Sequence, residues 1–181
     1  MKTYAFIFAR GGSKGVARKN IRSLAGKPLL VYSIELAKKI EFIDKVFVST
    51  EDPEIANVAL DNGVNVIDRP GELALDDTPE WLVWQHAIEW IQERGDDFDV
   101  FLSLPATSPL RNSDDVLHCL CRLDAKTDVV VTITESSRSP WFNMVKISKE
   151  GAVSLLLSGG NYTQRQTTPK TYDITTVAYV S

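Results

Sequence analysis

Short apolar segments alternate with helical patterns along the first two thirds of the sequence, and this alternation constrains the fold more than any other feature. The segments are rich in Val, Ile or Phe, and polar or turn residues bound them, which is typical of buried strands. Strands that alternate with helices predict an α/β fold, with a mostly parallel sheet and helices on both of its faces. The predicted strands are residues 4–9, 45–49, 64–67, 100–104 and 129–134.

Proline and capping side chains mark the expected starts of four helices between these strands. After Thr134 the rhythm changes, and residues 144–148, 152–157 and 175–180 are expected to form short β elements separated by loops. We therefore expect a single domain over residues 1–181 that includes a small β-rich part. The helices are expected to begin at Pro28, Asp52-Pro53, Thr78-Pro79-Glu80 and Ser113-Asp114-Asp115.

Positive charge is concentrated near the start of an otherwise acidic chain. The 181 residues carry a net charge of −4, yet the first 34 residues contain seven cations and no acid. Nucleic-acid binding needs a broad basic face, so this distribution favours a compact anionic ligand. No apolar run is long enough to span a membrane, and the N-terminus lacks a signal-peptide pattern. We expect a cytoplasmic protein that binds neither nucleic acid nor membrane.

Two groups of distinctive side chains have simple structural interpretations. Cys119 and Cys121 are too close together for a disulfide framework. Together with His118 they could suggest a metal site, but a free cysteine on a helix is usually a small buried apolar residue, and we expect that here. A tryptophan row at helical spacing favours core packing over base stacking. Its members are Trp81, Trp84 and Trp90.

A glycine-rich cationic loop follows the first predicted strand. It reads Arg10-Gly11-Gly12-Ser13-Lys14-Gly15, and it matches neither the P-loop nor the dinucleotide-binding spacing. Its glycines let backbone N–H groups approach an anion, and Arg10, Lys14 and Lys19 can surround a polyphosphate. The alternative is a tight turn whose cations are solvated. Ligands of parallel sheets bind at the carboxyl ends of the strands, where the loops after the next three strands are also polar.

Five motifs in order along nearly the whole chain give it a family resemblance. It resembles the sugar nucleotidyltransferases that make CMP-activated acid sugars, and most closely the N-acylneuraminate cytidylyltransferases, or CMP-sialic acid synthetases. The motifs are "ARGGSKG" at 9–15 with Lys19-Asn20 and "LAGKPLLVYSI" at 24–34, "VSTED" at 48–52, "RPGELALDDT" at 69–78, "LPATSPLR" at 104–111, and Arg165-Gln166 before a strand ending in "AYV".

This resemblance implies a Rossmann-like nucleotidyltransferase fold, Mg²⁺ as cofactor, and CTP and an acid sugar as substrates. The anomeric hydroxyl of the acylneuraminate would attack the α-phosphate of CTP, giving CMP-acylneuraminate and pyrophosphate. It assigns catalytic roles to Arg10, Lys14 and Lys19. It assigns nucleotide binding to Ala9, Gly11, Gly12, Ser13, Asn20, Arg69, Ala106, Thr107 and Ser108. It assigns substrate binding to Pro105, Arg111 and Arg165.

The chain departs from the family pattern on the sugar side and in its length. Pro105 stands where many members have Gln, and Thr175-Thr176 stands where many have Asn-Gly. Legionaminate, pseudaminate and Kdo therefore stay open as alternative sugars, although the glycine loop reads differently from the Kdo enzymes. Members usually continue through an Asp-x-Asp metal motif, so we expect the C-terminal part of the family fold to be absent. The metal ligands stay unknown, and a truncated, non-catalytic nucleotide-binding module is a further alternative.

Residues 140–172 are expected to form a dimerisation arm, also on the basis of the resemblance. Trp141 and Phe142 would anchor it on a second subunit, and a turn at Gly159-Gly160-Asn161 belongs to it. A homodimer follows, in which Arg165 could act in the site of the neighbouring subunit.

We expect Lys14→Ala to lose most pyrophosphate release from CTP without unfolding the protein. The reason is that the loop would lose a cation which stabilises negative charge on the transferred and departing phosphates. A pyrophosphate-release assay beside a thermal melt checks this. Turnover near that of the wild type would contradict the assignment.

Overall fold

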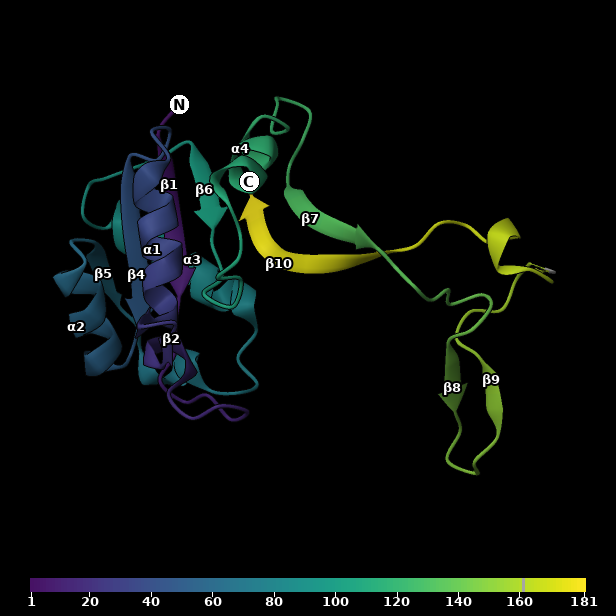
Figure 1. Cartoon of the computed structure of the whole chain (residues 1–181). Coiled ribbons are helices and arrows are strands. Elements are labelled where there is room, and N and C mark those ends of the chain that lie inside the picture. The colour runs from purple at the N-terminus through teal and green to yellow at the C-terminus, as the bar shows by residue number, and fades with distance from the viewer. Residues whose placement is uncertain (161) are drawn as a thin grey trace. The chain divides into compact units, whose positions relative to one another are not determined.

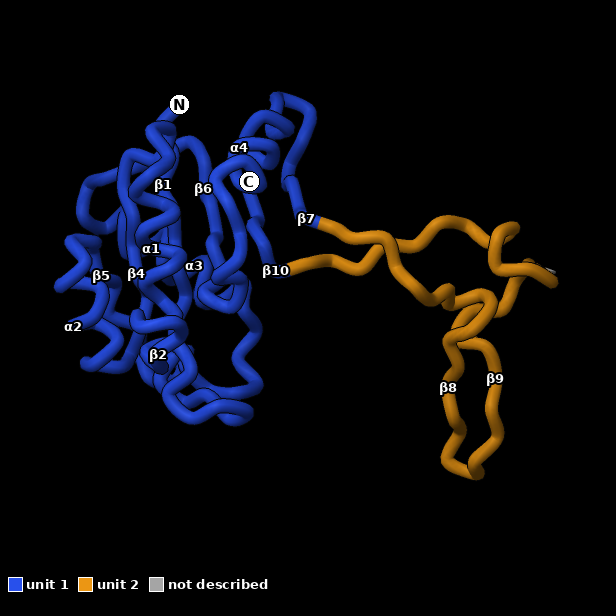
Figure 2. Tube along the Cα trace, in the orientation of Figure 1, with its two compact units in different colours: residues 1–132, 176–181 blue, residues 133–175 orange. Residues whose placement is uncertain are grey.

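The computed structural model describes residues 1–160 and 162–181, and these form two compact units. Unit 1 contains residues 1–132 and 176–181, and unit 2 contains residues 133–175 (Figure 2). The predicted arm, residues 140–172, falls within unit 2, and Asn161 of its predicted turn lies outside the described residues.

The sheet of the structure has six strands in the order β5-β4-β1-β6-β10-β7 (Figure 1). Strand β1 pairs in parallel with β4 and β6, and β4 pairs in parallel with β5. Strand β10 pairs antiparallel with β6. The three parallel pairings confirm the prediction of a mostly parallel sheet. The strands are β1 (Thr3–Phe8), β4 (Lys45–Thr50), β5 (Asn65–Asp68), β6 (Val100–Ser103), β7 (Val130–Glu135) and β10 (Tyr172–Val180).

Helices cover both faces of the sheet, because β1 buries apolar side chains on both sides of its backbone. Ala5 and Ile7 join the core cluster that includes residues of α1, α2 and α4. Tyr4 and Phe6 point to the other face, into an aromatic cluster packed against α3. The helices are α1 (Leu29–Lys39), α2 (Pro53–Asp61), α3 (Glu80–Gln92) and α4 (Ser113–Leu120). Among the described residues, none of the helices has the length and apolar character needed to cross a bilayer.

Local details refine two of the expectations, the start of the fourth helix and the packing of the tryptophan row. Helix α4 is capped by Asn112 and not by Ser113, because the Asn112 side chain accepts the N–H of Asp115 while the Asp115 carboxylate accepts the N–H of Asn112. The prediction of core packing is confirmed for Trp84 and Trp90 and is wrong for Trp81, whose side chain is exposed.

Other small elements follow local chain chemistry. The hairpin of β2 (Ser23–Leu24) and β3 (Lys27–Pro28) turns through Ala25 and Gly26, both of which have positive φ. The 3₁₀ turns are η1 (Lys19–Ile21), η2 (Gly71–Ala74) and η3 (Arg165–Thr167). Cys119 is buried in the core, and the described residues contain no cluster of three or more His, Cys, Asp or Glu that could hold a metal.

Unit 2 holds two of the three short β elements expected after Thr134, whereas the third, expected at 175–180, is part of β10 in the six-stranded sheet. Strands β8 (Val145–Ile147) and β9 (Val153–Leu155) form an antiparallel hairpin. Val145, Ile147, Val153 and Leu155 are exposed apolar residues of this hairpin.

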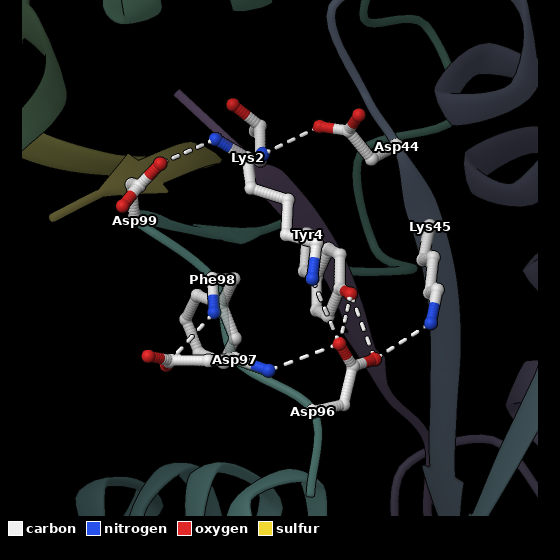
Figure 3. A network of polar contacts seen from close by, with 9 residues as sticks. Lys2, Tyr4, Asp44, Lys45, Asp96, Asp97, Phe98 and Asp99 are labelled. Atoms are coloured by element: carbon white, nitrogen blue, oxygen red, sulfur yellow. Dashed lines mark hydrogen bonds and ion pairs between the residues drawn. The ribbon is translucent and has the colours of Figure 1, made fainter.

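A network of charges joins the chain at the amino ends of three strands (Figure 3). The carboxylate of Asp96, shortly before β6, accepts from Lys2 Nζ at 2.9 Å, from Lys45 Nζ at 2.6 Å and from the Tyr4 hydroxyl at 2.7 Å. Lys2 precedes β1 and Lys45 begins β4, so the network links the central strands. Hydrogen bonds from Lys45, Lys2 and Tyr4, in that order, hold the pKa of Asp96 well below its usual range.

We expect Asp96→Asn to lower the Tm by a few degrees at pH 7, because an amide cannot replace the carboxylate between two lysines. The folded-state pKa of Asp96 is depressed, so its contribution is complete above the unfolded-state value of about 4 and is lost as the pH falls toward the folded-state value. Melts of both proteins from pH 7 to pH 2.5 check this. The Tm gap should close below about pH 4, and Asp128→Asn, which removes an exposed carboxylate, should show no such gap.

Candidate functional site

A cavity of about 760 Å³ in unit 1 lies at the carboxyl ends of β1, β5 and β6. Phe8 ends β1, Ser103 ends β6, and Arg69 follows β5 directly, and all three line the cavity. This is the edge at which ligands of parallel sheets bind, and the volume suits a molecule of nucleotide size.

The structure gathers most of the predicted site residues around this cavity. Those that line it are Arg10, Ser13, Lys14, Lys19, Asn20, Arg69, Pro105, Ala106 and Thr107. Those that do not line it are Ala9, Gly11, Gly12, Ser108, Arg111 and Arg165.

Two cations of the glycine loop already hold an anion. Arg10 Nη2 lies 2.7 Å from Asp76 Oδ1, and Lys14 Nζ lies 2.5 Å from Asp76 Oδ2. Lys14, and after it Arg10, lowers the pKa of Asp76 from its ordinary value. The backbone beneath is held by the buried Asn20, whose side-chain N–H donates to the Arg10 carbonyl at 3.0 Å. The two cations are thus arranged to bind one bridging anionic group.

Arg69 brings a buried charge to the cavity. Its guanidinium donates to the Ser49 hydroxyl at 3.2 Å and to the Ser49 carbonyl at 2.6 Å, and it lies 6.0 Å from the centroid of the Phe8 ring. Burial lowers the pKa of Arg69 to about 10, so it remains charged at neutral pH. A cation in such a low-dielectric position attracts an anion more strongly than one in water.

Arg111 is buried, and its hydrogen bonds stabilise the loop after β6. Its guanidinium donates to the Val177 carbonyl, to Ser33 Oγ at 2.7 Å and to the Pro105 carbonyl at 3.2 Å. Burial lowers the pKa of this arginine also, to about 10. Ser108 Oγ donates to the Thr176 carbonyl at 2.8 Å, so the loop after β6 is fastened to β10. Direct substrate contacts of Arg111 stay a prediction.

Arg165 lies in unit 2, where it lines a hollow of about 330 Å³. Arg138 and Lys170 line the same hollow, together with Glu135. This cationic hollow suits an anion, and the predicted contact of Arg165 with the acid sugar stays a prediction.

Sequence reasoning did not assign several residues that line the cavity. Tyr179 and Thr176 come from β10, and the Tyr179 backbone is paired with Ser103 of β6. Burial, and secondarily the nearby Glu80 carboxylate, raises the pKa of Tyr179. Glu80 itself lines the cavity from the start of α3. The alternating pattern of the last strand was a signal for burial, but its place beside β6 was not readable from the sequence.

Comparisons with known proteins give the family. A family model described as "Cytidylyltransferase" matches residues 4–174. The chain is 35% identical over 179 residues to "Post-translational flagellin modification protein B" of Campylobacter coli, covering 96% of this chain and 74% of that protein. It is 34% identical over 177 residues to "CMP-N,N'-diacetyllegionaminic acid synthase" of Campylobacter jejuni, with the same coverage of each. The chain belongs to the cytidylyltransferase family, which confirms the resemblance and makes the protein a nucleotidyltransferase.

A solved structure supports the fold. A CMP:2-keto-3-deoxy-manno-octonic acid synthetase complexed with CTP matches with a TM-score of 0.72 at 19% identity, covering 99% of this chain and 73% of that one. The expected Rossmann-like nucleotidyltransferase fold is therefore confirmed.

We expect Asp76→Asn to bind metal-free CTP roughly threefold more tightly, because the carboxylate no longer competes with phosphate for Arg10 and Lys14. Calorimetry in EDTA measures the affinity without any contribution of a divalent cation. Asp77→Asn is the matched control, because Asp77 does not line the cavity. Weaker binding by Asp76→Asn would mean that the carboxylate itself helps to hold the nucleotide.

Proposed function

We propose that this cytidylyltransferase transfers CMP from CTP to the anomeric hydroxyl of a nine-carbon, N-acylated acid sugar and releases pyrophosphate. The observation that carries the proposal is the cavity at the carboxyl edge of the sheet, which is lined by Arg10, Lys14, Lys19 and Arg69 in a chain of this family. Four cations on one cavity suit a triphosphate.

Catalysis of this reaction depends on electrostatic stabilisation of the transition state more than on covalent chemistry by the protein. The anomeric oxygen bonds to the α-phosphorus, the bond to the bridging oxygen breaks, pyrophosphate leaves, and the hydroxyl proton is released. Negative charge accumulates on the phosphoryl oxygens and on the leaving group. Arg10, Lys14 and Lys19 would balance that charge, and the Ser13 hydroxyl would donate to a phosphate oxygen.

CTP and the acid sugar would contact different parts of the cavity wall. Arg69, Ala106 and Thr107 would border the nucleotide, while Pro105, Thr176 and Tyr179 would border the sugar. N-acylneuraminate is the proposed acid sugar, with legionaminate and pseudaminate as alternatives. A relative named for N,N'-diacetyllegionaminic acid supports the nine-carbon class, and a solved structure named for an octonic acid keeps Kdo in the comparison.

The homodimer and the location in the cytoplasm are part of the same proposal. Exposed apolar residues on β8 and β9 support a second subunit that would cover them, and Arg165 would then act on the carboxylate of an acid sugar. An arginine fork matches a carboxylate in shape and charge.

Mg²⁺ is the proposed cofactor. It usually takes one or two carboxylates and completes its coordination with phosphate oxygens and water. Asp76 and Glu80 are carboxylates that line the cavity, so they are the side chains that would hold such an ion, which would neutralise phosphate charge when bound.

A pyrophosphate-release assay tests the function. CTP and Mg²⁺ are incubated with N-acetylneuraminate, legionaminate, pseudaminate or Kdo, with UTP and ATP as nucleotide controls. We expect release that depends on CTP and is fastest with one nine-carbon sugar. A rise in Tm with CTP but no release with any sugar would favour the second candidate, a nucleotide-binding module without catalysis, and a rise with NAD alone would contradict both.

A further inference from the structure

Four consecutive residues, Ser49 to Asp52, bind either Arg69 of the cavity wall or residues that stand next to the wall in the chain. The Ser49 carbonyl accepts from the Ala9 N–H at 3.1 Å and from Arg69, and the Thr50 carbonyl accepts from the Arg69 N–H at 3.0 Å. Glu51 Oε1 accepts from the Gly11 N–H at 2.7 Å, and Asp52 binds Arg18. None of these four residues lines the cavity, so each acts through a neighbour.

Asp52 fixes the end of this segment to the start of α2. Its Oδ1 accepts from the N–H groups of Glu54 at 2.9 Å and Ile55 at 3.2 Å, so it caps α2. Its Oδ2 lies 2.2 Å from the place where a Cβ on Gly11 would be. The cationic loop therefore packs its backbone directly against the start of α2, and Gly11 is the residue that permits this approach.

Glu51 is unusual because only one of its two carboxylate oxygens accepts a hydrogen bond. Oε1 holds the Gly11 N–H, while Oε2 is buried and has no hydrogen-bond partner among the described residues. An unpaired buried carboxylate oxygen is costly, and the attraction between Glu51 and the buried Arg69 offsets part of that cost. The Gly11 carbonyl in turn accepts from the Ser13 N–H at 3.0 Å, so fixing Gly11 also fixes the turn that carries Ser13 and Lys14.

We propose that Glu51 is a positioning residue, which holds the Gly11 peptide so that Arg10, Ser13 and Lys14 face a triphosphate in the cavity. This inference rests on the proposed function for the identity of the nucleotide, but the anion-binding loop can be tested without it. The contact with Gly11 is one accepted hydrogen bond, so a glutamine carbonyl in the same place can replace it, whereas the charge interaction of Glu51 with Arg69 is lost in both the Ala and the Gln variant.

Binding of inorganic triphosphate in EDTA is the primary test, because it probes the loop without base, sugar or turnover. We expect Glu51→Ala to weaken binding about tenfold and Glu51→Gln to stay within about threefold of the wild type. The matched control is Asp61→Ala, which removes an exposed carboxylate from the end of α2 and should bind as the wild type does. Thermal melts establish that each variant is folded.

A second set of variants covers the case in which Glu51→Ala does not fold. Gly11→Ala should also weaken triphosphate binding, because its Cβ meets Asp52, whereas Gly71→Ala adds a Cβ with no atom within 4 Å and should not. In the enzyme assay, Glu51→Ala should raise the KM for CTP and leave the KM for the acid sugar unchanged.

The outcomes separate this inference from the proposed function. Wild-type binding of triphosphate without pyrophosphate release would remove the proposed function and leave the role of Glu51 supported by the variants. Equal affinity of Glu51→Ala and the wild type would overturn the inference. So would equal weakness of folded Glu51→Ala and Glu51→Gln, because charge and not the hydrogen bond would then be responsible.

Discussion

Parallel pairing of β1 with both β4 and β6 is the constraint on which the site depends. Strand β1 is buried on both faces, and its pairing brings the ends of three strands to one edge. The loop after β1 therefore lies beside the segment after β4 and the loop after β6, because the strand pairing itself places all three at the same edge. Hydrophobic burial of one strand thus decides where Arg10 and Pro105 can meet a common ligand.

Charge in the site is supported by internal partners and not left to solvent. Arg10 and Lys14 share Asp76, while Arg69 is held by Ser49. These partners fix the positions of the cations before a ligand binds, and a phosphate would have to displace Asp76 from Arg10 and Lys14. Arg111 is equally buried, yet its hydrogen bonds connect the loop after β6 to α1 and β10. Arg69 and Arg111 are therefore similarly buried, but Arg69 lines the cavity and Arg111 does not.

Much of the fold was predictable because its signals are local. Apolar runs located β1, β4 and β6, and prolines or caps located the starts of α1, α2 and α3 to within a few residues. Exceptions have local physical causes as well. Asn112 competes with Ser113 as the cap of α4 because its side chain reaches the N–H of Asp115, and Trp81 is exposed because it lies on the outer face of α3.

The sequence by itself determined the strand-helix order, the cationic glycine loop and the family, since periodicity, turn chemistry and motif order are properties of neighbouring residues. Tertiary structure alone decided that β10 lies antiparallel beside β6 and brings Tyr179 to the cavity. It also decided that Asp76 bridges Arg10 and Lys14, and that Arg111 is bound from within. These contacts join residues more than sixty positions apart, and their geometry exists only once the sheet order is set.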